Sequence, residues 1–410
     1  MKKTIFFILT LVFLFSSLNL TDEWNIKGVF LVYILLISLF IVPIFIKGKL
    51  KINLPTVITI YLFILFCVIS SYVNVDPKSI FGATMIFILF IVSCIIVPSL
   101  NLNLNKIIVY AILISHFPLI IFPLIINGFD TNPYSGIFYN PNSMGTVAGT
   151  IFAVLFAGFL SDLEYFIRGY KIDNKKINIF IHGSLLLFSF YLITVSSSRT
   201  SFLAAILCVL VGITYLSVYL IKTKKFLSFI VKGGIFSGIS ALLLMLILKF
   251  TRLNEAIYNN IFYKFELRGS QSGVLSSRDD IWGKTIQEAG AFGNGNNYFT
   301  EMGIGAHNTF ISILGEYGWF SLIIFITFLI IGLYYSAKYS LCDVNDRYKY
   351  VPLMMFIIFI TRSMGEVMIF KISMIAMFFS LGAVMKRKAF AEKKISIRNK
   401  GEIERHIVQL

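Results

Sequence analysis

Two arginines and a histidine are the residues of this chain best suited to chemistry on an anion. Arg199 follows three consecutive serines between two long apolar runs, Arg278 stands directly before two aspartates, and His307 precedes an asparagine and a further apolar run. Guanidinium groups bind phosphate oxygens through paired hydrogen bonds. A neutral imidazole can take a proton from a hydroxyl near neutral pH. The three residues predict an anion-binding site that contains one base.

Each of these residues also has a plainer structural explanation. Arg199 can anchor a helix end at the lipid headgroups, and Arg278 can pair with a neighbouring aspartate at a helix start capped by Ser277. His307 can cap or pack against the helix that follows it. The turn at Arg199 is so short that the guanidinium must stay close to membrane depth, where a charge is costly unless it is paired or hydrated. This favours a functional role for Arg199.

Several polar residues near these positions are candidates for lining the same site. The serine hydroxyls before Arg199, Ser198 among them, can complete an anion site. Asn140 and Asn142 flank a proline just before an apolar run, where Asn142 or Ser143 can cap the helix. Across the last turn on the same side of the membrane, Arg362 and Glu366 are four residues apart, which predicts an ion pair.

The composition indicates that these residues are positioned by membrane-spanning helices. The chain has 410 residues, of which 57% are hydrophobic and 14% charged, whereas soluble domains carry about 25% charged residues. Apolar runs close to the ~20 residues that cross a bilayer recur along its length. We expect an all-α, polytopic membrane protein with about twelve spans, at roughly 4–20, 28–46, 55–73, 81–98, 107–127, 143–160, 178–195, 201–220, 226–250, 317–336, 350–362 and 367–385.

The distribution of positive charge predicts the topology. Most Lys and Arg residues fall in alternate gaps between these runs, at the N-terminus and in the tail, as expected if both ends lie in the cytoplasm. The extracytoplasmic side then receives Arg199, Arg278 and His307. The chain divides into N-terminal spans 1–127, spans with the Asn-Pro-Asn and Ser-Arg motifs at 128–250, one long extracytoplasmic loop at 251–316, spans 317–385 and a basic cytoplasmic tail at 386–410.

Composition and residue spacing also argue against a nucleic-acid partner, a metal site and a cleaved signal peptide. The net charge of +16 is explained by Lys and Arg in cytoplasmic loops, so no nucleic-acid partner is expected. The four cysteines show neither metal-ligand nor disulfide spacing, and no carboxylate or cysteine stands at metal spacing from His307. We expect no metal and no cofactor. The apolar run at the N-terminus lacks a small-residue cleavage site, so it is interpreted as an uncleaved first span rather than a signal peptide.

Taken together, the motifs resemble those of the O-antigen ligase and O-antigen polymerase superfamily of bacterial envelope glycan assembly. The resemblance covers 130–385 and lies in the order of its parts along one side of the membrane. These parts are Gly136 with Asn140-Pro141-Asn142, Ser198-Arg199-Thr200 with Leu203, the long loop with Arg278, Trp282, Gly293 and Gly295, and His307-Asn308 followed by Glu316 and Gly318.

The resemblance implies an inverting, metal-independent membrane glycosyltransferase of the bacterial cytoplasmic membrane. Its donor would be an oligosaccharide linked to a polyprenyl (undecaprenyl) diphosphate, and its acceptor a glycan hydroxyl at the extracytoplasmic face. Arg199 and Arg278 would hold the diphosphate, and His307 would activate or orient the acceptor. The binding residues would be Ser198, Asn140, Asn142, Asn308 and Glu316.

The acceptor is left open by these motifs. A polymerase of O-antigen or capsular polysaccharide, which we favour, would extend another lipid-linked repeat unit. It would work beside the lipid bilayer and a possible chain-length regulator. A ligase would use lipid A-core or another envelope polymer. A lipid-linked glycan flippase or other carrier is the competing class, since twelve spans with both ends inside is a common carrier architecture. Carriers, however, carry polar residues deep in several spans, whereas here the notable charges gather at the outer side.

Overall fold

The fold was analysed in a computed structural model of the chain. The structure describes residues 2–21, 23–40, 52–100, 102–129, 133–169, 175–227, 230–231, 255, 257–263, 278–303, 305–342 and 346–385. The predicted tail 386–410 lies outside the described residues, as do Ser277, with its predicted capping role, and most of the predicted span 226–250.

The described part of the chain is helical and contains no strand. Its main α-helices are α1 (Lys2–Leu18), α2 (Asn25–Ser38), α3 (Leu54–Val73), α4 (Lys78–Phe90), α5 (Val97–Ser99), α6 (Leu104–Asn127), α7 (Pro141–Arg168), α8 (Lys175–Val195), α9 (Arg199–Lys222), α13 (Arg278–Glu288), α14 (Tyr298–Glu301), α15 (Thr309–Ser340) and α16 (Val351–Ser363). Two π-helical turns are η2 (Ile91–Ile96), which joins α4 to α5, and η3 (Tyr258–Phe262). A last helix covers Ile372–Met385.

Seven helices of the described residues are long and apolar enough to cross a membrane. They coincide with seven of the predicted spans, and they are α3, α4 with η2 and α5, α6, α7, α8, α9 and α15. Shorter apolar helices occupy the predicted spans near 28–46, 350–362 and 367–385, and α1 occupies the first. The all-α class and the membrane-spanning character are therefore confirmed, while the number twelve stays a prediction.

Large apolar side chains cover the outside of the helices. Phe7 on α1 is 62% exposed, Phe122 on α6 63% and Phe180 on α8 74%. Surfaces of this kind are unstable in water, whereas hydrocarbon accepts them. The exposed apolar faces fit a lipid bilayer as the surrounding medium.

Asparagine side chains fix where four helices begin. The Asn53 and Asn103 side chains accept from the backbone N–H groups three residues on, at the starts of α3 and α6. Asn140 accepts from Ser143 N at the start of α7, and Asn308 accepts from Phe310 N and Ile311 N at the start of α15. Such caps satisfy N–H groups that have no partner inside the helix. The cap of α7 is therefore Asn140, and the prediction of Asn142 or Ser143 is wrong, because Pro141 already occupies the first helical position.

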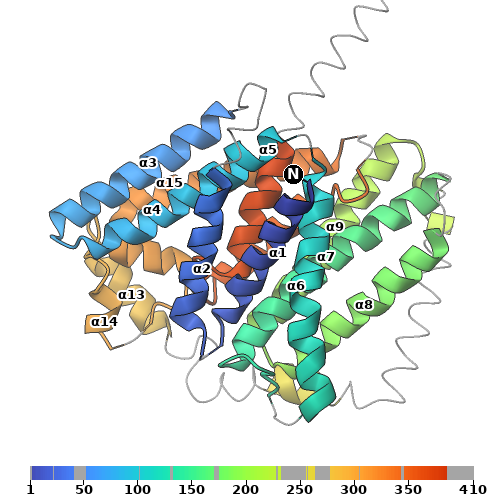
Figure 1. The fold of residues 1–410 in the computed structure, drawn as a ribbon, viewed down its shortest axis with the longest axis horizontal. Coiled ribbons are helices and arrows are strands. Elements are labelled where there is room, and N and C mark those ends of the chain that lie inside the picture. Colours follow the sequence, from blue (N-terminus) through green and yellow to red (C-terminus); the bar gives the residue numbers. More distant parts are fainter. Residues whose placement is uncertain are drawn as a thin grey trace, which may run out of the picture.

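Helix α7 is the central element of the right half of Figure 1, where it lies among α6, α8 and α9. Nearly all of its side chains are buried, and it also packs against α16. On the other side of the molecule α15 packs against α3 and α13, and α16 contacts both α15 and α9. Helix α16 thus connects the two halves, and its end leads into the turn that carries Glu366.

A buried polar network holds the far end of α7. Asp162 accepts two hydrogen bonds from Arg347, at 2.9 and 3.0 Å, and lies 2.7 Å from His182 Nδ1. Glu164 lies 2.8 Å from Lys349 Nζ. Because buried charges are stable only when paired and hydrogen-bonded, the network attaches the segment before α16 firmly to α7.

Candidate functional site

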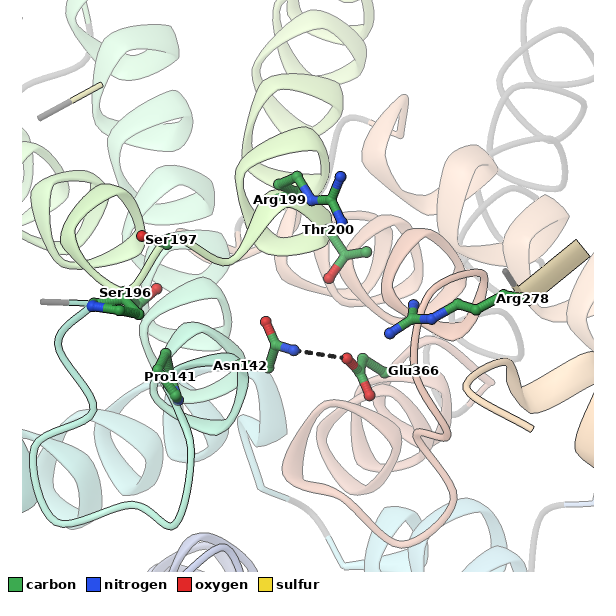
Figure 2. A pocket seen from close by; sticks show the side chains of 9 residues that line it. Pro141, Asn142, Ser196, Ser197, Arg199, Thr200, Arg278 and Glu366 are labelled. Carbon is green, nitrogen blue, oxygen red and sulfur yellow. Dashed lines mark hydrogen bonds between the residues drawn. The ribbon is translucent and has the colours of Figure 1, made fainter. Parts of the chain in front are cut away.

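A cavity of about 210 Å³ lies where several helices begin. Its wall contains Asn142 from the first turn of α7, Arg199 and Thr200 from the first turn of α9, and Arg278 from the start of α13. The remaining lining residues are Pro133, Pro141, Ser196, Ser197 and Glu366. Figure 2 shows Arg278 reaching toward Glu366 from one side of the cavity, with Asn142 opposite and Arg199 above. Three of the predicted site residues, Asn142, Arg199 and Arg278, thus share one cavity.

The first turns of three helices lie at this cavity. Each helix N-terminus carries a partial positive charge and N–H groups without intrahelical acceptors. At α9 the capping position is occupied by Ser198, but its hydroxyl makes no capping bond and donates instead to Ser201 Oγ at 2.9 Å. A fourth helix, α15, begins beside the cavity, and its first residue Thr309 donates to the carbonyl of Glu366 at 3.0 Å. Such convergence of helix N-termini favours a bound anion.

The turn after α16 is fixed by three consecutive carbonyl groups. Met364 O accepts from Asn308 Nδ2 at 3.2 Å, and Gly365 O accepts from an Arg278 guanidinium N–H at 2.8 Å. Glu366 O accepts the Thr309 hydroxyl. Two predicted site residues, Asn308 and Arg278, therefore hold the backbone that carries the cavity's carboxylate.

A fully buried arginine stands behind the wall of the cavity. Arg362 donates to Ser198 Oγ at 3.4 Å and to the carbonyl of Asn142 at 3.3 Å, and its side chain is 0% exposed. The predicted ion pair between Arg362 and Glu366 is wrong. No Arg362 nitrogen lies within 4 Å of that carboxylate among the ion pairs of the described residues, because the guanidinium is turned toward α7 and α9.

Glu366 is the carboxylate of the cavity. Its Oε1 accepts from Asn142 Nδ2 at 3.0 Å, and its Oε2 lies 4.0 Å from His307 Nδ1. Burial alone would raise the pKa of Glu366, but contact with His307 and the charges of nearby cations outweigh burial and hold that pKa below its ordinary value. The cations are Arg362, Lys371 and Arg278. The carboxylate is therefore ionised near neutral pH.

His307 does not line the cavity, but its Nδ1 lies 4.0 Å from the carboxylate of Glu366, which does. The His307 side chain is 45% exposed, and its φ of 49° is in the left-handed region that non-glycine residues seldom adopt. It immediately precedes Asn308, the capping residue of α15, and the carbonyl of Ala306 accepts from the Trp282 ring N–H at 3.0 Å. The histidine is thus held beside Glu366 by fixed neighbours on both sides, rather than by packing of its own ring.

The other predicted residues lie apart from the cavity wall. Asn140 and Ser198 sit directly behind it, as the α7 cap and as the partner of Arg362. Glu316 is inside α15, where its carboxylate accepts from Ser312 Oγ at 2.7 Å, and it does not line the cavity. Gly293 and Gly295, which belong to the resemblance, both have positive φ, and Gly293 packs on the backbone of α15 at Glu316 and Gly318.

Sequence reasoning missed two participants. Glu366 was expected only as a structural partner, and Thr200 was regarded only as a neighbour of Arg199. Glu366 could have been found from its place on the same predicted side of the membrane as the arginines. Its spacing of four residues from Arg362, however, predicted an ion pair between those two residues. In the described residues no group of three or more metal-ligating side chains is present.

Comparison with known proteins places the chain in no family: no protein-family model matches it, and no curated protein is similar to it.

Proposed function

We propose that this protein is a membrane glycosyltransferase that transfers glycan from a polyprenyl-diphosphate-linked oligosaccharide to an acceptor sugar hydroxyl. The observation that carries the proposal is one small cavity at which three helices begin and which two arginines line. Helix N-termini and arginines are the two devices by which proteins most often bind phosphate groups. Their coincidence beside lipid-facing helices supports a lipid-linked phosphate ligand.

The size of the cavity supports recognition of the charged part of such a donor. Sites for whole small molecules usually measure ≈ 300–1,000 Å³, whereas this cavity has about 210 Å³. A diphosphate is compact and would lie in the cavity. The glycan would extend toward His307, and the polyprenyl chain would remain in the lipid.

The arrangement of residues suits displacement at the anomeric carbon. The acceptor hydroxyl would give its proton to His307 while its oxygen forms a new bond to the anomeric carbon. The bond from that carbon to the diphosphate oxygen would break, with its electron pair remaining on the leaving group. Arg199, Arg278 and the helix N-termini would stabilise the negative charge that develops there. Attack from the side opposite the diphosphate would invert the configuration.

Transfer by purified protein in lipid tests the proposal. Synthetic polyprenyl-diphosphate repeat units are supplied without any other acceptor, and wild type is compared with His307→Ala and with Arg199→Ala. A ladder of longer lipid-linked glycans that disappears in both variants is the result expected of a polymerase of O-antigen or capsular type. Exposed Lys284 on α13, 57% accessible, provides the control Lys284→Ala, which should keep the ladder.

The same assay separates the alternatives. Transfer that begins only after lipid A-core is added would identify a ligase that uses the same cavity. Inactivity with both acceptors, combined with movement of a labelled lipid-linked glycan across the membrane, would refute glycosyl transfer and identify a flippase.

A further inference from the structure

A carboxylate inside an anion cavity requires an explanation. Glu366 lines the same cavity as Arg199 and Arg278, and its negative charge must repel a bound diphosphate. A neutral side chain of similar shape would preserve the wall without that cost. The presence of a carboxylate here therefore points to a role other than holding the wall together.

The contacts of Glu366 are few compared with those of a structural carboxylate in the same chain. Asp162 has two hydrogen bonds from Arg347 and a close contact with His182, all at 3.0 Å or less. The Glu366 carboxylate has one hydrogen bond, from Asn142, and its shortest ion-pair distance is 4.0 Å. Glu366 is held by one hydrogen bond, by the contact with His307 and by the charges around it, and a competing anion can displace such a carboxylate.

The turn that carries Glu366 does not depend on its side chain. The carbonyls of Met364, Gly365 and Glu366 are each bonded by a side chain from another element. Because these bonds engage only the backbone, they would remain in place if the carboxylate changed partners.

Charged groups face Glu366 from every element around it. Arg278 comes from the start of α13, Arg362 from α16, Lys371 from the connection that follows, and His307 from the segment before α15. Arg199 of α9 lines the same cavity, and α7 contributes the neutral amide of Asn142. A diphosphate in the cavity would compete for Arg199 and Arg278, and would leave Glu366 with His307 at 4.0 Å and with the charges of Arg362 and Lys371, which do not line the cavity.

We propose, building on the anion site proposed above, that the carboxylate of Glu366 balances the positive charges at the cavity when no diphosphate is bound. A bound diphosphate competes for Arg199 and Arg278, and the carboxylate, which already lies 4.0 Å from His307 Nδ1, then pairs more closely with that histidine and strengthens it as a base. Glu366 is a positioning residue in this scheme, because it acts through His307. Activation of the base is thereby linked to the presence of the donor.

Binding and turnover of charge-neutral variants test this inference. Farnesyl diphosphate serves as the probe for binding, and the transfer assay gives kcat and KM. Glu366→Gln and Glu366→Ala should bind the probe about tenfold more tightly than wild type, because repulsion is removed. Their kcat should fall by about a hundredfold, the usual range for loss of an assisted base, and the pH profile of kcat should change. Glu366→Asp keeps the charge and should keep the affinity of wild type.

A matched control and three contrary results complete this test. Exposed Glu301 on α14 lies outside the cavity wall, so Glu301→Gln should change neither quantity. Neutral variants that fold but bind no more tightly than wild type would overturn the inference. Failure of both to fold would overturn it too, because the turn would then depend on this side chain. If wild type itself fails to bind the probe, the anion site proposed above is refuted instead.

Discussion

Three arginines near one cavity have different tasks. Arg199 and Arg278 line the cavity, and Arg278 also donates to the carbonyl of Gly365. Arg362 is buried behind the wall and bonds to Ser198 and to the carbonyl of Asn142. Since a buried guanidinium without a close carboxylate is costly, Arg362 is better explained by the positive potential that it adds than by stability.

Replacement of Arg362 by methionine separates these two explanations. Arg362→Met should change the melting temperature little, because the relief of burying a guanidinium offsets the loss of its two hydrogen bonds and of its attraction to Glu366. The affinity for farnesyl diphosphate should fall by about tenfold, since one cation of the site is lost. Thermal melts and binding measurements on the same preparations check this. A large loss of stability with unchanged affinity would show that Arg362 is structural.

Glu366 should also affect stability at low pH. Its pKa in the folded protein lies below the ordinary 4.5, so its favourable contacts are present above pH 4.5 and are lost as the pH falls through the lower folded value. The melting temperature of wild type should therefore decrease more between pH 6 and acidic pH than that of Glu366→Gln. Parallel melting curves for the two proteins over this range would contradict the assignment.

At the level of single residues, the sequence predicted which residue types form the site more successfully than it predicted which side chains contact one another. The residue types of Arg199, Arg278 and Asn142 pointed to an anion site, and the structure gathers them around one cavity. The spacing of Arg362 and Glu366 predicted a local pair, but the guanidinium bonds to α7 and α9 instead. Helical spacing shows which side chains are close along one helix, and it cannot show which helix packs alongside.

Among the elements, the kink of α15 sets the position of the segment beside the site. Gly318 inside α15 has φ 82°, and a Cβ there would lie 2.3 Å from the backbone N of Gly293. The two backbones can approach this closely only because both residues are glycine. The contact fixes the segment between α13 and α14 against α15, and α13 carries Arg278.

Alanine at Gly318 should disrupt this contact. Gly318→Ala introduces both a clash and a strained φ, so we expect a loss of at least about 1–3 kcal/mol of stability and weaker transfer. Gly283 in α13 is the matched control, because no atom lies within 4 Å of the position of its Cβ. Gly283→Ala should be neutral or stabilise by up to about 1 kcal/mol. Thermal melts compare the two, and equal effects would contradict the account.

Elements were the level at which the sequence was most informative. Apolar runs located the seven long helices of the described residues, whereas the asparagine caps at four helix starts were not predicted. The kink at Gly318 could not be predicted, because it depends on a close approach to a segment about 25 residues earlier. The hydrogen bond from the Asn308 side chain to the carbonyl of Met364 could not be predicted either, because it also depends on tertiary packing.

For the whole molecule, the two ends of α7 have different environments. Its first turn lies at the cavity, and its far end is held by the paired charges of Asp162 and Glu164. Positive charge near that far end predicts that it faces the cytoplasm. The cavity would then open on the extracytoplasmic side, which is the side that the proposed glycan transfer requires.

Cysteine labelling tests this orientation. Of the four native cysteines, Cys67, Cys94 and Cys208 are buried, and Cys342 is partly accessible. The labelling is therefore done in the Cys342→Ser background. In intact spheroplasts an impermeant maleimide should label Glu301→Cys on α14 but not Lys222→Cys at the end of α9. Permeabilisation should expose the second site. Labelling of both positions in intact cells, or the reverse pattern, would refute the predicted topology.

The most direct test of the central claim is single-turnover transfer from a synthetic polyprenyl-diphosphate donor by wild type, Arg199→Ala and Arg278→Ala. If the cavity holds the leaving diphosphate, each substitution should lower the rate on the order of 10²–10³-fold, while Lys284→Ala retains the wild-type rate. Folded arginine variants that transfer glycan as fast as wild type would contradict the proposal that this cavity is the active site.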